Sequence, residues 1–192
     1  VSGNTGIGIS ATGGTLEVLR STVSDNAGGG IVINAANYTI VNNFIVDNKA
    51  TGVVSGVKID ATDGLTEVLD FNTLAGNTKS GTTGFALRCD TTSLTARNNI
   101  FMLALSNNAS LIEDCNTNHS VIDPRTDPND GIQDNVRSET ALFVDSENGD
   151  FHLLEGSPGT DVANGTPPAT DIDGDPRTAG SADMGADEFV AN

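Results

Sequence analysis

A short apolar line recurs four times in the first half of the chain and restricts what the chain can fold into. Each copy is a glycine followed by three residues, the first and third of them apolar, and the copies begin at positions 6, 30, 56 and 84. The intervals of 24, 26 and 28 residues are typical of a solenoid, in which one short unit cannot bury its own apolar face and must stack on the next.

Two further apolar stretches follow each copy, and each coil then closes near an asparagine. Asparagine tolerates left-handed backbone angles, and its amide can bond to the neighbouring coil. Three short strands per turn predict an all-β fold, a parallel β-helix of about four to five coils. The second stretch lies at 16–19, 38–41, 66–69 and 94–97, the third at 22–24, 44–46, 72–74 and 100–102, and the closing residues are Asn26, Asn48, Asn77 and Asn107.

The alternation in the first strand predicts which side chains face inward. Ile7 and Ile9 are expected to point into the core, with Ile31 and Ile33 stacked on them in register. A slip of one residue would expose the apolar row, so we expect this pattern to specify the register.

The repeat decays before the C-terminus. We assign residues 1–122 to the coils and 123–192 to an irregular capping segment packed on the same solenoid, because the latter is rich in Gly, Pro and Asp. Within the cap, residues 141–144 and 151–154 are predicted to pair as strands, since Asn148-Gly149 between them is a strong turn signal.

The formal net charge of −17 limits the partners of the chain. Such a field repels phosphate backbones and anionic lipid, and no run approaches the roughly 18 apolar residues of a membrane span. We therefore expect no nucleic-acid partner and no membrane span. The first residues already resemble the interior of a coil, so we expect N-terminal coils to be missing and the open edge of the first coil to favour self-association.

The C-terminal residues carry a second signature. Asp-x-Asp-Gly-x-x-Arg occupies 171–177 and Asp-x-Gly-Ala-x-Glu occupies 183–188. Together with the coil repeat, this ending resembles secreted bacterial surface proteins of the pectate-lyase-like superfamily, whose fold is a right-handed parallel β-helix. The resemblance covers nearly the whole chain and implies a secreted or cell-surface location. It does not select an activity, because such proteins include polysaccharide lyases, epimerases and adhesin-like proteins.

Two functions are consistent with this resemblance. The first is a non-catalytic structural or adhesive module that contacts polysaccharide. The second is the C-terminal part of a lyase or epimerase acting on uronate polymers, which needs a base for the C5 proton and a cation for the uronate carboxylate. Lys58, Asp60 and Arg88 are the catalytic candidates and Asp90 a ligand contact, on an outer face where Lys58 and Asp60 are expected beside Ala86 and Arg88. The alternative is a surface ion-pair cluster.

Aromatic and histidine residues add little to either function. Sugars usually stack on exposed Trp or Tyr side chains. The chain has no Trp and one Tyr, so Tyr38 is the candidate for such a contact. His119 and His152 are far apart in sequence and give little support to a zinc site. No Ser or Cys has a His and an acid at recognisable spacing.

Three aspartates near the C-terminus suggest a site that stabilises the cap. Asp171, Asp173 and Asp175 offer alternate carboxylates of the kind that Ca²⁺ binds, and the alternative is a set of Asx turns paired with Arg177, for which Glu188 or Asp183 would be another partner.

Cys89 and Cys115 are 26 residues apart, which is about one coil. Stacked neighbours at that spacing can be bridged, and a disulfide suits an extracellular chain. The alternative is two buried free thiols.

Overall fold

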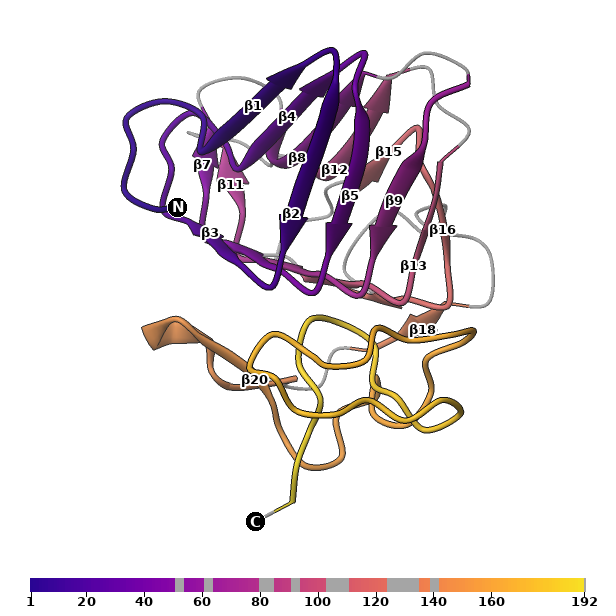
Figure 1. Ribbon diagram of the computed structural model, residues 1–192. Helices are drawn as coiled ribbons and strands as arrows, with labels where there is room; N and C mark the ends of the chain where they lie inside the picture. Colours follow the sequence, from indigo (N-terminus) through magenta and orange to yellow (C-terminus); the bar gives the residue numbers. More distant parts are fainter. Residues whose placement is uncertain are drawn as a thin grey trace.

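The computed structural model describes residues 1–50, 54–60, 64–79, 85–90, 94–102, 111–123, 135–138 and 142–191. In this part of the chain the regular structure consists of short strands and one 3-10 helix (Figure 1). Each turn of the solenoid contributes one strand to each of three parallel sheets, which confirms the predicted all-β parallel β-helix. Gly84, Asn107 and Ala141, which the repeat and the cap analysis singled out, lie outside the described residues.

The three sheets run side by side along the solenoid axis, and each strand pairs in parallel with the equivalent strand one coil away (Figure 1). The first sheet contains β1 (Ile9–Thr12), β4 (Ile31–Asn34), β8 (Val54–Asp60), β12 (Phe85–Asp90) and β15 (Ile112–Glu113). The second contains β2 (Thr15–Leu19), β5 (Asn37–Val41), β9 (Glu67–Asp70), β13 (Thr95–Arg97) and β16 (Asn116–Asn118). The third contains β3 (Thr22–Ser24), β6 (Phe44–Val46), β10 (Thr73–Ala75), β14 (Ile100–Met102), β17 (Val121–Ile122) and β18 (Val136–Arg137). A short fourth pair joins β7 (Lys49–Ala50) to β11 (Thr78–Lys79).

The register of the first sheet differs by two residues from the predicted one in the first and fourth coils. Ile9 pairs with Ile31, where the repeat predicted Ile7. Leu87 pairs with Val57, whereas the spacing of the repeat predicted that residue 85 would pair with Val57. Ile7, expected to point inward, is 41% exposed.

A column of glycines explains the observed register. A Cβ atom on Gly8 would lie 2.9 Å from the carbonyl oxygen of Gly30, and one on Gly30 would lie 2.7 Å from that of Gly56. Neither position has room for a side chain, because real Cβ atoms do not approach a backbone oxygen so closely. Gly8, Gly30 and Gly56 therefore stack on one another, and the residue after each one begins the inward-facing row. In the fourth coil the backbone of Ala86 takes the place against Gly56.

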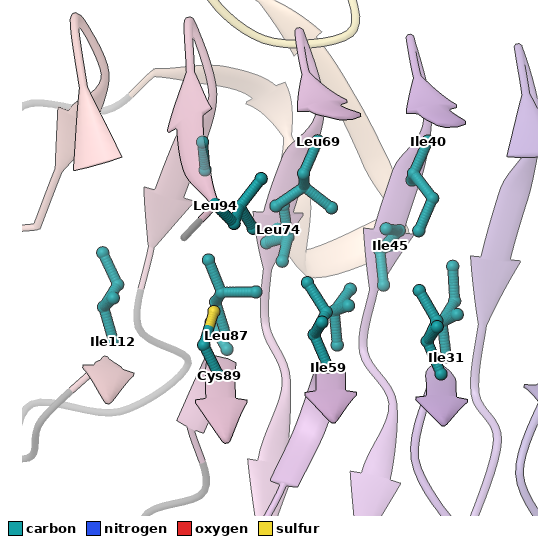
Figure 2. Packing of buried hydrophobic residues seen from close by; sticks show 14 of the residues in the cluster. Ile31, Ile40, Ile45, Ile59, Leu69, Leu74, Leu87, Cys89, Leu94 and Ile112 are labelled. Carbon is teal, nitrogen blue, oxygen red and sulfur yellow. The ribbon is translucent and has the colours of Figure 1, made fainter. Parts of the chain in front are cut away.

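The core is a dry column of aliphatic side chains along the axis. Figure 2 shows Ile31, Ile59 and Leu87 of the first sheet pointing toward Ile40 and Leu69 of the second. All five are fully buried. Each such side chain contributes about 1.5–3 kcal/mol when it is removed from water, so stacking of the coils is the main source of stability.

Two ladders of buried asparagines run through the bends on either side of the third sheet. In each ladder the side-chain amide of one residue donates to the Oδ1 of the next, at 2.9–3.1 Å. The same Oδ1 accepts the backbone N–H of the preceding asparagine, so the bends of neighbouring coils are joined by side chains as well as by backbone. The ladders are Asn26–Asn48–Asn77 and Asn43–Asn72–Asn99.

The C-terminal segment lies along the outer face of the third sheet (Figure 1). Phe151 and Ala186 pack on Phe44, Val46 and Ala75 of β6 and β10. This contact buries β6 and β10 on both faces, which is why every residue of those two strands is buried.

The cap contains the predicted strand pair. β19 (Phe143–Asp145) pairs antiparallel with β20 (Asp150–Leu153), and the connection is the 3-10 helix η1 (Ser146–Asn148), which ends at Gly149 with a left-handed φ of 85°. No helical segment in the described part of the chain has the length and apolarity that crossing a membrane requires.

Candidate functional site

The outer face of the first sheet carries a group of five charged side chains, here called the inter-coil charge cluster: Lys58, Asp60, Arg88, Asp90 and Glu113. They project from β8, β12 and β15 of successive coils. The register places Arg88 between Lys58 and Glu113, and Asp90 beside Asp60.

The structure brings together the four predicted residues but changes their order. Ala86 was expected beside Lys58 on the outer face. It is only 1% exposed and belongs to the core, so Arg88 takes the place beside Lys58 instead. The reason is the two-residue register difference of β12, which moves Asp90 into the row that Arg88 was expected to occupy.

Opposite charges alternate across the coils. Lys58 Nζ lies 3.1 Å from Asp90 Oδ2 and 3.9 Å from Asp60 Oδ2. Arg88 Nε donates a hydrogen bond to Asp90 Oδ1 at 2.9 Å. The same nitrogen is 3.0 Å from Glu113 Oε2, a charge contact without a hydrogen bond, because the Nε hydrogen points at Asp90. Both cations therefore have carboxylate partners on neighbouring strands or on their own strand.

The pKa shifts follow from these contacts. Burial pushes the pKa of Asp90 upward, but the hydrogen bonds from Arg88 and Lys58 outweigh it and hold that pKa below its usual range. The hydrogen bond to Asp90 raises the pKa of Arg88 above its usual range. Asp90 is thus a weak base, and Arg88 stays protonated.

The cluster has an excess of negative charge. Two cations face three carboxylates, a net charge of −1. A uronate carboxylate placed on this face would meet cations already neutralised and a local field of its own sign. The side chains are 28–49% exposed, and Asp60, the most exposed of them, is accessible to the hydroxyl groups of a neutral sugar.

Tyr38, the aromatic candidate for sugar contact, lies in the core. Its side chain is fully buried on β5, and burial raises its pKa far above the usual value. It therefore presents no ring surface to a ligand. The reason is its position in the inward-facing row of the second sheet, between Leu16 and Glu67.

The aspartates at 171–175 have separate roles. Asp171 is fully buried, and its Oδ1 accepts the backbone N–H groups of Asp173, Gly174 and Asp175 at 2.8–2.9 Å. Its Oδ2 accepts the N–H of Glu188 at 2.9 Å. Asp171 therefore forms the Asx-type turn considered as the alternative to calcium binding, and its oxygens are occupied. Asp175 is exposed.

Arg177 is the buried cation of the cap. Its side chain is 0% exposed and its Nη1 lies 3.0 Å from Glu188 Oε2. The guanidinium also donates to the carbonyl oxygens of Asp183 and Gly185 and lies 5.0 Å from the centre of the Phe71 ring. These contacts attach the C-terminal motif to itself and to the third bend of the solenoid.

Cys89 and Cys115 are joined by a disulfide between the fourth and fifth coils, with their Cα atoms 5.2 Å apart. Cys89 belongs to the core row of β12, beside Ile59.

The two histidines do not share a site. His119 Nε2 lies 2.8 Å from Asn164 Nδ2, whereas His152 contacts Asp150 and Asp173.

Sequence reasoning missed two participants. Glu113 completes the charge cluster. It could have been found from its sequence separation from Arg88, which is 25 residues or about one coil. His152 lies beside Asp173, and no sequence spacing indicates this contact, because the two residues are brought together by the packing of the cap.

Residues 1–148 match the family described as the right-handed β-helix region. The chain belongs to the right-handed β-helix family. The match ends inside the cap, so the motifs at 171–177 and 183–188 lie beyond it. No curated protein and no solved structure matches the chain. Membership of the right-handed β-helix family establishes the architecture, and function must be argued from the side chains that the helix displays.

Proposed function

We propose that this β-helix is a non-catalytic structural or adhesive module of a secreted or cell-surface bacterial protein and that it contacts polysaccharide. One observation carries the proposal: Lys58 and Arg88, the cations on the outer face of the first sheet among the described residues, are paired with carboxylates. Charges arranged in this way connect stacked coils and leave the face close to neutral.

The alternative, a lyase or epimerase for uronate polymers, needs a free base and an uncompensated cation on the same face. Asp90 has a depressed pKa and Lys58 is paired with two carboxylates. Asp60 is the most exposed carboxylate of the cluster, with 49% of its side chain accessible. Lys58, the cation beside it, is already paired with Asp90, so a uronate carboxylate placed here would lack an uncompensated cation.

A neutral polysaccharide fits this face better than an acidic one. The row formed by Asn34, Asp60 and Asp90 in adjacent coils repeats at about 4.8 Å, the spacing of paired strands. Amide and carboxylate oxygens at that spacing accept hydrogen bonds from sugar hydroxyls. A net charge of −1 at the cluster adds repulsion against a polyanion.

The disulfide between Cys89 and Cys115 supports the extracellular location. Disulfides persist in oxidising compartments and are rare in the cytosol. The acidic surface, with a net charge of −17, keeps such a module soluble outside the cell.

Affinity electrophoresis tests the binding proposal. Gels cast with a neutral glucan or galactomannan are expected to retard the protein, and gels with polygalacturonate are not. Asp60→Ala should weaken the retardation, and Glu17→Ala, which removes an exposed carboxylate from the second sheet, should leave it unchanged. Absence of retardation in every neutral polymer would refute the polysaccharide contact.

A separate assay tests the absence of catalysis. Polygalacturonate and alginate are incubated with the protein, with and without Ca²⁺, and ultraviolet absorbance of unsaturated products is followed. We expect no increase. An increase that disappears in Lys58→Ala would establish the lyase alternative.

We also propose self-association through the first coil. β1 and β2 are the end strands of their sheets, and beside them a hollow of about 530 Å³ is lined by apolar residues, among them Ile9, Leu16 and Leu19, and by the polar residues Glu17, Ser21 and Thr22. End strands beside exposed apolar side chains attract further β-structure. Light scattering should show association that Leu19→Lys reduces and Val144→Lys does not, and a monomer at millimolar concentration would refute it.

A further inference from the structure

Three potential metal ligands from separate parts of the cap converge on one point. They are His152 on β20, Asp173 in the loop that follows Ile172, and Asp187 near the C-terminus. One ligand atom from each lies within 4.8 Å of the others. The sequence separations of 21 and 14 residues show that packing of the cap, and not a local motif, creates this group.

The imidazole of His152 is held in one orientation by two contacts outside this group. Its ring meets the ring of Phe44 on β6 edge to face, with centroids 5.4 Å apart and an interplanar angle of 90°. Its Nδ1 lies 2.6 Å from Asp150 Oδ1. The Nε2 atom is thereby directed at Asp173, whose Oδ2 is 2.9 Å away. A histidine that binds metal through one nitrogen usually donates the other N–H to a carboxylate in this way.

Asp187 supplies a buried carboxylate. The residue is 6% exposed, and its Oδ2 accepts the backbone N–H of Leu153 at 2.7 Å. Within the described residues its carboxylate accepts no second hydrogen bond. A cation at this point would offset the cost of burying the carboxylate.

The ligand types select the kind of metal. One imidazole with two carboxylates is a donor set found around zinc and its first-row neighbours. Ca²⁺ requires six to eight oxygen ligands, and the group offers too few. With a neutral imidazole the three ligands carry a charge of −2, which a divalent cation neutralises.

We propose that His152, Asp173 and Asp187 bind a divalent transition metal of the zinc class, with Asp150 as the positioning residue that orients the imidazole. The three ligands leave the fourth position of a tetrahedral site to water. His152 Nε2 and Asp173 Oδ2 are 2.9 Å apart, so a metal with ligand bonds of about 2.0–2.2 Å would replace their direct contact. The exposed side chain of Asp173 can make the small movement that this requires. The metal would tie β20 to both C-terminal motifs and strengthen the attachment of the cap.

Calorimetric titration of tag-free protein with ZnCl₂ tests the proposal, and the visible absorption of the Co²⁺ form reports the ligand geometry. We expect one bound metal per chain. His152→Gln and Asp173→Asn should each weaken binding by at least about tenfold, and Asp150→Asn should weaken it by about 10–100-fold. Asp173 is exposed and its side chain contacts only His152 among the described residues, so Asp173→Asn is expected to fold normally.

Two matched variants control for non-specific binding. His119→Gln removes the other histidine, and Asp175→Asn removes an exposed carboxylate from the same loop. Both should bind Zn²⁺ within about twofold of the parent. At one Zn²⁺ concentration, the rise in melting midpoint should be the same in the parent and in these controls and smaller in Asp173→Asn.

Several outcomes would overturn the proposal. Absence of Zn²⁺ and Co²⁺ binding at millimolar concentration would show that the group is a hydrogen-bonded histidine–carboxylate arrangement only. Equal affinity in His152→Gln would place the ion elsewhere. Tighter binding of Ca²⁺ than of Zn²⁺ would exclude the zinc-class assignment. None of these results depends on whether the protein binds polysaccharide.

Discussion

Asn72 lies at the centre of the second asparagine ladder, and its replacement by Ala measures what the ladder contributes to stability. The side chain is fully buried. Its Oδ1 accepts the N–H and the Nδ2 hydrogen of Asn43, and its Nδ2 donates to the carbonyl oxygens of Ile40 and Asp70 and to Asn99 Oδ1. A single truncation therefore removes five hydrogen-bond contacts, three of which share the two hydrogens of Nδ2.

The expected cost follows from what is left behind. The buried N–H of Asn43 donates to Asn72 Oδ1, and a buried donor that loses its partner costs about 1–3 kcal/mol. The other contacts amount to about three hydrogen bonds, which contribute about 1 kcal/mol each on a net basis, partly offset because the amide no longer has to be buried. We expect Asn72→Ala to lower the free energy of unfolding by about 3–4 kcal/mol, a large part of the 5–15 kcal/mol typical of a domain.

Urea denaturation followed by circular dichroism measures this change. The matched control is Asn37→Ala, which removes two exposed hydrogen bonds, one accepted from the N–H of Thr66 and one donated to the carbonyl oxygen of Gly14; water replaces both, so the loss should stay below about 1 kcal/mol. If Asn72→Ala proves too unstable to purify, Asn77→Ala tests the first ladder, since Asn77 binds Asn48 and the Ile45 carbonyl. Similar losses at buried and exposed positions would refute the ladder argument.

Three further predictions concern the remaining contacts. Replacing Cys89 and Cys115 together by Ala should lower the free energy of unfolding by about 2–4 kcal/mol, and two free thiols in denatured, unreduced protein would contradict the bridge. Arg177→Ala should cost about 3–5 kcal/mol because it leaves the Glu188 carboxylate without its cation; an unchanged urea midpoint would show that the pair does not stabilise the cap. Burial raises the pKa of Asp70 to about 6, above the value of about 3.9 in unfolded chains, so the charged form destabilises the fold. Stability should therefore rise as pH falls from about 7 to about 4, and Asp70→Asn should reduce that slope, whereas parallel pH profiles would argue against the shift.

The sequence predicted the class of fold from local alternation. Whether a residue such as Ile31 or Ile59 faces inward depends on its immediate neighbours in a strand, and these are visible in the chain itself. The closing asparagines were predicted from their place at the bends, and their amides do bond to the next coil. The left-handed backbone angles belong instead to the residues before them, Asp25, Asp47 and Gly76.

The register was harder to predict, because it depends on contacts between coils. A Gly at position 6 and a Gly at position 8 are equally good starts for the first copy. Only the approach of Gly8 to the backbone of Gly30 selects between them. Phe71 is a second example: it takes the left-handed bend position (φ 56°) that Asn42 occupies one coil earlier, and it is covered by Arg177.

The candidate site likewise has features that the sequence predicted and features that it could not predict. That Lys58 and Asp60 face outward was readable from their place in a period-two strand, and the disulfide was suggested by a separation close to one coil. The salt bridge of Lys58 with Asp90 depended on the true register. The meeting of His152 with Asp173 and Asp187 depended on how an irregular segment packs on the third sheet.

From its sequence alone this chain determines that it must coil, that its strands are parallel, and which rows are apolar, since each of these properties is encoded by residues a few positions apart. Tertiary structure alone decides which coil positions stack, where the cap lies and which charged groups meet. These depend on close approach between residues that are 14 or more positions apart, such as Leu153 and Asp187. No repeated pattern in the sequence marks such a contact.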